Sequence, residues 1–133
     1  MAIIFEKFNI NSCGFGDTVD ILPKIYGVIK AKDTKNGLLN INVSSPLSVI
    51  YVGKSEDFFK LNSFLDETIK SSDKSYNTDT YLATLSFKAN YFKNNVTIPV
   101  ENSKLLLENL DRIYFIDFEN KKSIKEILVS ILE

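Results

Sequence analysis

The sequence predicts an α+β protein in which an antiparallel or mixed sheet carries about three helices packed against it. Three observations lead to this prediction. Short β-branched and aromatic runs dominate the first part of the chain, a strongly amphipathic segment occupies residues 56–70, and strand and helix patterns alternate after it. The 133 residues, of which 44% are hydrophobic, suffice for one core, so we expect a single domain over residues 1–133.

The chain opens with a predicted strand over residues 3–10, which the turn-like residues 11–17 bring to an end. Residues 18–28 carry apolar side chains at a spacing that would suit a helix. Pro23 and Gly27 both disfavour a helix interior, so this segment stays open between helix and strand.

A hairpin and a further strand follow in the prediction. Residues 28–32 and 38–43 are expected to pair, because Asn36-Gly37 between them adopts positive φ at little cost. Residues 47–52 are rich in β-branched and aromatic side chains and predict the next strand.

The middle of the chain predicts a helix, a loop and a long strand. Ser55 is a suitable N-cap for a helix over residues 56–70. Residues 71–80 are polar and predict an exposed loop. Apolar and polar residues alternate almost strictly over residues 81–91, which predicts a half-buried strand.

The last third predicts two strands and two helices. Strands are expected over residues 96–100 and 112–118, with a short helix between them that Asn102 or Ser103 would cap. A terminal helix is expected from Ser123, which has capping-box spacing to a glutamate. The apolar stripe of this terminal helix would comprise Ile124, Ile127, Leu128 and Ile131.

The most restrictive feature of the composition is the absence of histidine. It excludes nucleophilic sites of the Ser/His/Asp and Cys/His types. The single cysteine, Cys13, cannot form an intrachain disulfide or a cysteine-rich metal site, and it favours a reducing compartment. We therefore expect a protein that is not an enzyme and that holds no metal and no cofactor.

Charge and hydropathy also limit the partners. Sixteen basic and seventeen acidic residues leave a net charge of −1, and Arg112 is the only arginine, so direct nucleic-acid binding is not expected. No signal peptide is evident, and the longest apolar runs have about five residues where a spanning helix needs about twenty. We expect a cytoplasmic protein without membrane contact.

Two groups of residues are candidates for a functional site. Asp117 and Glu119 flank Phe118 at a predicted strand end and point to the same side, where acidic groups can act in acid–base or metal chemistry; a solvated strand end is the alternative. Tyr76 lies between Asp73 and Asp79 in the polar loop, an arrangement typical of protein interfaces as well as of solvated loops.

In its small size, α+β pattern and lack of catalytic motifs, the chain resembles bacterial immunity proteins of contact-dependent growth inhibition systems. The resemblance implies a cytosolic, non-catalytic inhibitor that binds a cognate protein toxin and covers its active site or substrate surface. The oligomeric state stays open. The predicted partner-binding residues are Asp73, Tyr76, Asp79, Asp117 and Glu119.

Two alternatives remain at this point. One is a small enzyme or ligand-binding domain that uses Asp117, Glu119 or a tyrosine. The other is a phage or accessory assembly protein that associates through a strand edge.

Overall fold

The structure, a computed structural model, describes residues 3–72, 85, 87–89 and 91–133. Its helices are α1 (Leu22–Ala31) and α2 (Ser55–Ser72), and residues 85, 87–89 and 91 are helical as well. Its strands are β1 (Ile3–Ser12), β2 (Asp17–Asp20), β3 (Gly37–Val43), β4 (Ser48–Gly53), β5 (Asn95–Glu101), β6 (Lys104–Leu105), β7 (Arg112–Asp117) and β8 (Ser123–Leu132).

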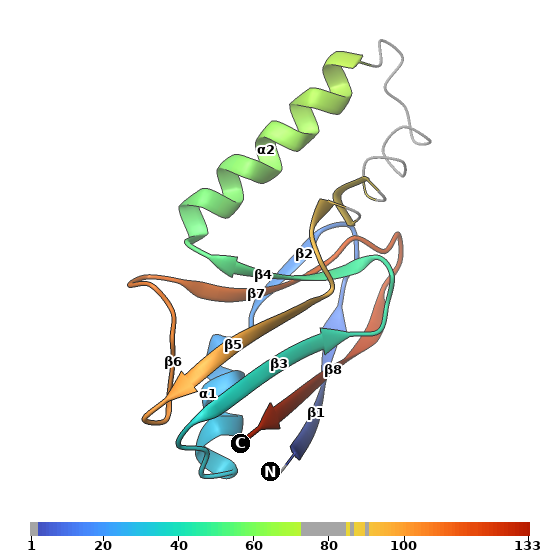
Figure 1. The fold of residues 1–133 in the computed structure, drawn as a ribbon. Helices are drawn as coiled ribbons and strands as arrows, with labels where there is room; N and C mark the ends of the chain where they lie inside the picture. Colours follow the sequence, from blue (N-terminus) through green and yellow to red (C-terminus); the bar gives the residue numbers. More distant parts are fainter. Residues whose placement is uncertain (1–2, 73–84, 86, 90) are drawn as a thin grey trace.

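The strands form two antiparallel sheets (Figure 1). The large sheet has the order β1-β8-β3-β5-β6, and the small sheet has the order β2-β7-β4. β1 pairs with β8 from Ile3 opposite Leu132 to Ser12 opposite Ser123, so the two ends of the chain lie side by side. Antiparallel sheets with helices beside them confirm the predicted α+β class.

The small sheet separates two hydrophobic cores. Ile113 and Phe115 of β7 are fully buried in the main core, which the two sheets and α1 enclose. Ile116 and Phe118 face the opposite way, because side chains alternate along a strand, and they pack beneath α2 and against Leu85, Ala89 and Phe92. In Figure 1, α2 lies over β4 and β7. This second core is the layer in which the candidate site forms.

Sequence patterns placed several elements correctly. The strands β1, β4, β5 and β7 and the helix α2 lie where they were predicted, with ends that differ by a few residues. The open segment 18–28 divides into β2 and the start of α1. Pro23 is compatible with α1 because it lies in the first turn, where its missing N–H has no intrahelical partner to lose.

The predicted terminal helix is wrong, because residues 123–132 form the strand β8. This strand has β1 on one side and β3 on the other, so its backbone groups have partners at both edges. Ile127 and Ile131 are fully buried, as alternation requires, whereas Ile124 is 68% exposed. A run rich in isoleucine fits the period of a helix as well as that of a strand. Pairing with β1 and β3 on both sides stabilises the strand.

The predicted strand over residues 81–91 is also wrong for the residues that the structure describes there. They are helical, and the Phe92 N–H donates a hydrogen bond to the Lys88 carbonyl. Leu85, Ala89 and Phe92 are buried at helical spacing against the small sheet. The near-perfect alternation of apolar and polar residues in the sequence predicted a strand, although Leu85, Ala89 and Phe92 also have helical spacing.

Two further local predictions are wrong. Residues 28–31 end α1 instead of pairing with β3, and Asn36-Gly37 leads from the helix region into β3. No helix forms after Asn102: Asn102 and Ser103 both have positive φ and make the tight turn between β5 and β6.

No described helix is long and apolar enough to cross a membrane.

Candidate functional site

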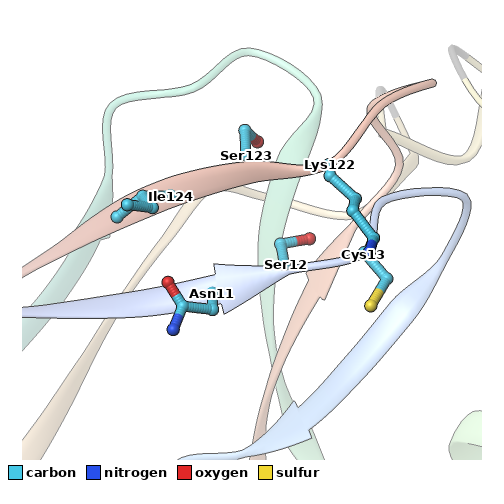
Figure 2. A pocket seen from close by; sticks show the side chains of 6 residues that line it. All are labelled: Asn11, Ser12, Cys13, Lys122, Ser123 and Ile124. Atoms are coloured by element: carbon cyan, nitrogen blue, oxygen red, sulfur yellow. The ribbon is translucent and has the colours of Figure 1, made fainter.

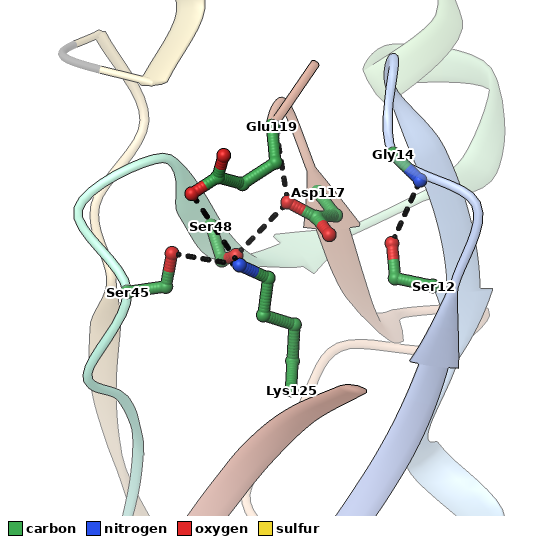
Figure 3. Close-up of polar contacts among 7 residues, drawn as sticks. All are labelled: Ser12, Gly14, Ser45, Ser48, Asp117, Glu119 and Lys125. Carbon is green, nitrogen blue, oxygen red and sulfur yellow. Dashed lines mark hydrogen bonds and ion pairs between the residues drawn. The ribbon is translucent and has the colours of Figure 1, made fainter. Parts of the chain in front are cut away.

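A buried polar cluster lies where β7 ends in the centre of the small sheet (Figure 3). Asp117 is fully buried, and its Oδ1 accepts hydrogen bonds from the Ser48 hydroxyl at 3.2 Å and from the Glu119 backbone N–H at 3.0 Å. Its Oδ2 is buried without a hydrogen-bond partner among the described residues. Asp117 thus ties the end of β7 to the start of β4.

Lys125 closes the same cluster from the large sheet. Its Nζ lies 3.5 Å from the Glu119 carboxylate and 3.3 Å from the Ser45 hydroxyl. Both charged side chains are largely buried, with 11% and 19% exposure for Lys125 and Glu119. The cluster therefore joins the two sheets through a shielded ion pair.

We expect Asp117→Ala to lower the free energy of unfolding by about 1–3 kcal/mol, because the Ser48 hydroxyl and the Glu119 N–H lose a buried acceptor. Urea denaturation of the variant measures this change. Glu101→Ala, at an exposed position of β5, is the control and should stay within about 0.5 kcal/mol of wild type. Equal midpoints for all three proteins would contradict this role of Asp117.

The structure places two of the five predicted site residues. Asp117 and Glu119 lie together in the polar cluster, whereas Asp73, Tyr76 and Asp79 lie outside the described residues. A partner-binding role for these five residues stays a prediction. Within the described part of the chain, no group of three or more histidine, cysteine, aspartate or glutamate residues could hold a metal ion.

An open groove of about 330 Å³ lies beside this cluster, where β1 ends next to the start of β8 (Figure 2). The Cys13 thiol is exposed in this groove rather than packed as a structural cysteine. A lone exposed thiol does not make a site, and we assign the groove no function.

A smaller and more enclosed cavity of about 190 Å³ lies on the other face of the small sheet. We call it the Lys88 pocket. α2 and the helical residues near 88 form its roof, and the end of β7 forms its floor. The described residues that line it are Phe15, Gly16, Phe58, Asn62, Asp66, Leu85, Lys88, Ile116 and Phe118.

A partly buried ion pair lines this pocket. Lys88 is only 6% exposed, and its Nζ lies 2.6 Å from the carboxylate of Asp66, whose side chain is 35% exposed. The same ammonium lies 5.9 Å from the centre of the Phe118 ring, within reach of a cation–π interaction. The other described lining residues carry no charge, so the charges of the described walls balance.

Asn62 supplies the unusual feature of the pocket. Phe58, Asn62 and Asp66 recur every four residues on α2 and therefore lie in one row along the helix. The Asn62 Oδ1 is buried and has no hydrogen-bond partner among the described residues. A buried carbonyl oxygen that accepts no hydrogen bond is costly, so this atom is a ready acceptor for a ligand N–H or O–H.

The turn between β1 and β2 forms one end of the pocket. Gly14, Phe15 and Gly16 all have positive φ, and the Phe15 and Gly16 N–H groups donate to the Glu119 and Asp117 carbonyls. These hydrogen bonds fix the turn to the end of β7 and hold Phe15 at the pocket. The sequence predicted a tight turn here but gave no reason to connect it with a site.

Tyr51 belongs to the aromatic cluster beside the pocket, with ring centres 5.2 Å from Phe58 and 5.9 Å from Phe92. Burial raises the pKa of the Tyr51 phenol above its usual value of 10.0, and the carboxylates of Asp57 and Asp111 raise it further.

The raised pKa of Tyr51 predicts a loss of stability at alkaline pH. The folded protein binds this proton more tightly than the unfolded chain, so the stabilisation is complete below about pH 10 and is lost as the pH rises through the folded-state pKa. Tyr51→Phe should make the decrease in unfolding free energy above about pH 10 less steep in urea titrations. Tyr26→Phe, at a more exposed position, is the control, and identical slopes for both variants would contradict the prediction.

Comparisons with known proteins place the chain in a family. A family described as UPF0047 protein YjbQ-like matches residues 6–133. The comparison with curated proteins found no match.

Solved structures share the fold at low sequence identity. A YbjQ-like protein of unknown function from Sulfolobus solfataricus P2 is 19% identical, with a TM-score of 0.80, over 98% of this chain and 96% of that chain. A hypothetical protein from Aeropyrum pernix K1 is 17% identical, with a TM-score of 0.78, over 97% and 98% of the two chains. An uncharacterised YjbQ/UPF0047 protein from Clostridium acetobutylicum is 15% identical, with a TM-score of 0.77, over 96% and 99%.

These comparisons overturn the resemblance to immunity proteins of contact-dependent growth inhibition systems, and with it the predicted function of toxin neutralisation. The resemblance was based on size and general architecture, which many unrelated small domains share. The matching family and the solved structures are described without reference to toxins or inhibitors. The chain belongs to the YjbQ-like UPF0047 family.

Proposed function

We propose that this protein binds a small polar molecule in the Lys88 pocket without transforming it. The observation that carries the proposal is the buried Asn62 Oδ1, which accepts no hydrogen bond from a described residue and lines a cavity that also holds the Lys88–Asp66 pair. Polar groups that converge on one enclosed cavity are typical of small-molecule sites.

The size of the cavity limits the ligand. A volume of about 190 Å³ corresponds to roughly six water molecules at about 30 Å³ each. This is below the range of about 300–1,000 Å³ that holds drug-sized ligands. We therefore expect a molecule with fewer than about ten non-hydrogen atoms.

Binding without turnover is the simpler use of these groups. None of the described lining residues carries a hydroxyl or a thiol, so hydroxyl and thiol nucleophiles are missing from the described walls, and the Asp66 carboxylate is paired with Lys88. The Lys88 Nζ is engaged by the Asp66 carboxylate at 2.6 Å. We infer a ligand-binding role for both charged groups.

The thiol and the overall charge of the protein also bear on where it acts and what it binds. The unpaired thiol of Cys13 suits a reducing compartment such as the cytoplasm. The balanced charge and the single arginine favour a small molecule over a nucleic acid or a membrane as the partner.

Methyl NMR of the folded protein tests the proposal. We would titrate a set of small polar compounds of all charge types at millimolar concentration and follow the methyl signals of Leu85 and Ile116, two pocket residues. At least one compound should shift these signals in a saturable way. Asn62→Ala should weaken its binding about tenfold through the lost hydrogen bond.

Ser63→Ala, at the neighbouring exposed position of α2, is the matched control and should bind like wild type. If no compound shifts the Leu85 and Ile116 signals, or if Asn62→Ala binds as well as wild type, the proposed function is wrong.

A further inference from the structure

The charges of the Lys88 pocket define the class of molecule that it selects. We infer that the pocket recognises small zwitterions, specifically α-amino acids with short aliphatic side chains. This inference rests on the proposed function and gives the ligand a chemical identity.

The charges of the described lining residues balance. Among the described lining residues, Lys88 contributes one positive charge and Asp66 one negative charge, at 2.6 Å from each other. A purely anionic ligand would approach Lys88 but would also bring its charge close to Asp66, and a purely cationic ligand would meet the reverse problem. Lys88 is 6% exposed and the Asp66 side chain is 35% exposed, so each would leave one net charge in a partly shielded site, which is costly.

The orientation of the Lys88–Asp66 pair also limits the ligand. Because its two charges are adjacent, the pair is a dipole, and its best partner is a second dipole in the opposite orientation. In an α-amino acid the ammonium and the carboxylate are attached to one carbon atom, so they lie as close together as the pair itself. The ligand carboxylate then faces Lys88 while the ligand ammonium faces Asp66, and charges alternate around the group.

The unpaired Oδ1 of Asn62 offers a further contact to the ligand ammonium. An ammonium has three N–H donors, and Asp66 accommodates only part of them. Asn62 lies one helical turn before Asp66 on α2, and its buried Oδ1 accepts no hydrogen bond from a described residue. Asn62 and Asp66 together offer the two neighbouring acceptors that an ammonium group requires.

The space beside these polar groups limits the side chain of the ligand. Leu85, Ile116 and Phe118 contribute apolar groups to the walls, with Phe58 on α2, while polar atoms make up most of the surface that faces the cavity. A short aliphatic side chain can contact these apolar groups. The volume of about 190 Å³ leaves no room for a long charged side chain. Valine is therefore a suitable probe of the site.

The experiment compares L-valine with two analogues that each lack one charge. Isovalerate keeps the carboxylate and the carbon skeleton, and isobutylamine keeps the ammonium. Titrations followed by the Leu85 and Ile116 methyl signals should show L-valine binding at least tenfold more tightly than either analogue. Lys88→Met and Asp66→Asn should each weaken valine binding at least tenfold.

Two further variants control for stability. Lys60→Met removes a lysine that is ion-paired with Glu56 on an exposed face of α2, and it should bind valine like wild type. The double variant Lys88→Met with Asp66→Leu removes both charges together, leaves neither partner buried alone, and should fold but not bind valine.

The outcomes separate this inference from the proposed function. If isovalerate or isobutylamine binds as tightly as valine, or if only other compounds bind in an Asn62-dependent way, the zwitterion inference is wrong and the proposed function stands. If no compound of any class shifts the pocket signals, both are wrong.

Discussion

Replacing Ile127 with alanine should lower the free energy of unfolding by about 2–5 kcal/mol. Ile127 has no exposed surface and packs in the main core from β8, the strand between β1 and β3. Removal of its side chain leaves a cavity that the paired strands on both sides cannot close by moving. Denaturant unfolding followed by circular dichroism measures the change.

The control for this prediction is Ile124→Ala on the same strand. Ile124 is 68% exposed, so its loss should change the unfolding free energy by less than about 0.5 kcal/mol. On a helix both isoleucines would share one face and both substitutions would be costly. Similar large losses for the two variants would therefore contradict the strand assignment of β8.

A single methyl group at Gly14 should destabilise the protein by about 2–5 kcal/mol, the sum of left-handed backbone strain and overpacking. The φ of Gly14 is +70°, and a Cβ there would lie 2.4 Å from the Lys121 carbonyl oxygen and 2.7 Å from that of Glu119. Both oxygens belong to the backbone, so neither can move aside without displacing the connection between β7 and β8. Thermal and urea denaturation of Gly14→Ala measure the loss.

Gly27→Ala provides a control of opposite sign. Gly27 lies inside α1, and a Cβ there would meet no atom within 4 Å. Alanine in a helix interior is more favourable than glycine, so the variant should gain about 0.5–1 kcal/mol. If Gly14→Ala is as stable as wild type, the close approach of this turn to the Lys121 carbonyl is wrong.

The elements that sequence patterns predicted correctly are those with one strong local signal. The β-branched runs of β4 and β7 and the amphipathic pattern of α2 each fit a single period. β8 and the residues near 85–92 fit two periods, and the choice depends on strands that are distant in sequence. No local pattern contains that information.

The same reasoning explains which site residues were missed. Asp117 and Glu119 are neighbours on one strand end, so the sequence alone brings them together. Lys88 and Asp66 come from separate segments, and the alternation over 81–91 placed Lys88 on the polar face of a strand. The signal that could have found the pocket is the row of Phe58, Asn62 and Asp66, where polar side chains continue an apolar helix face.

The proposed function depends on a ligand that binds in the Lys88 pocket, and this binding can be observed. A crystal structure of the protein with the tightest-binding compound from the NMR titrations tests it most directly. We predict that the compound lies in this pocket, with a donor group within hydrogen-bond distance of the Asn62 Oδ1 and polar contacts to Lys88 or Asp66. A compound bound elsewhere on the protein, with only water beside Asn62, would show that the Lys88 pocket is not the ligand site.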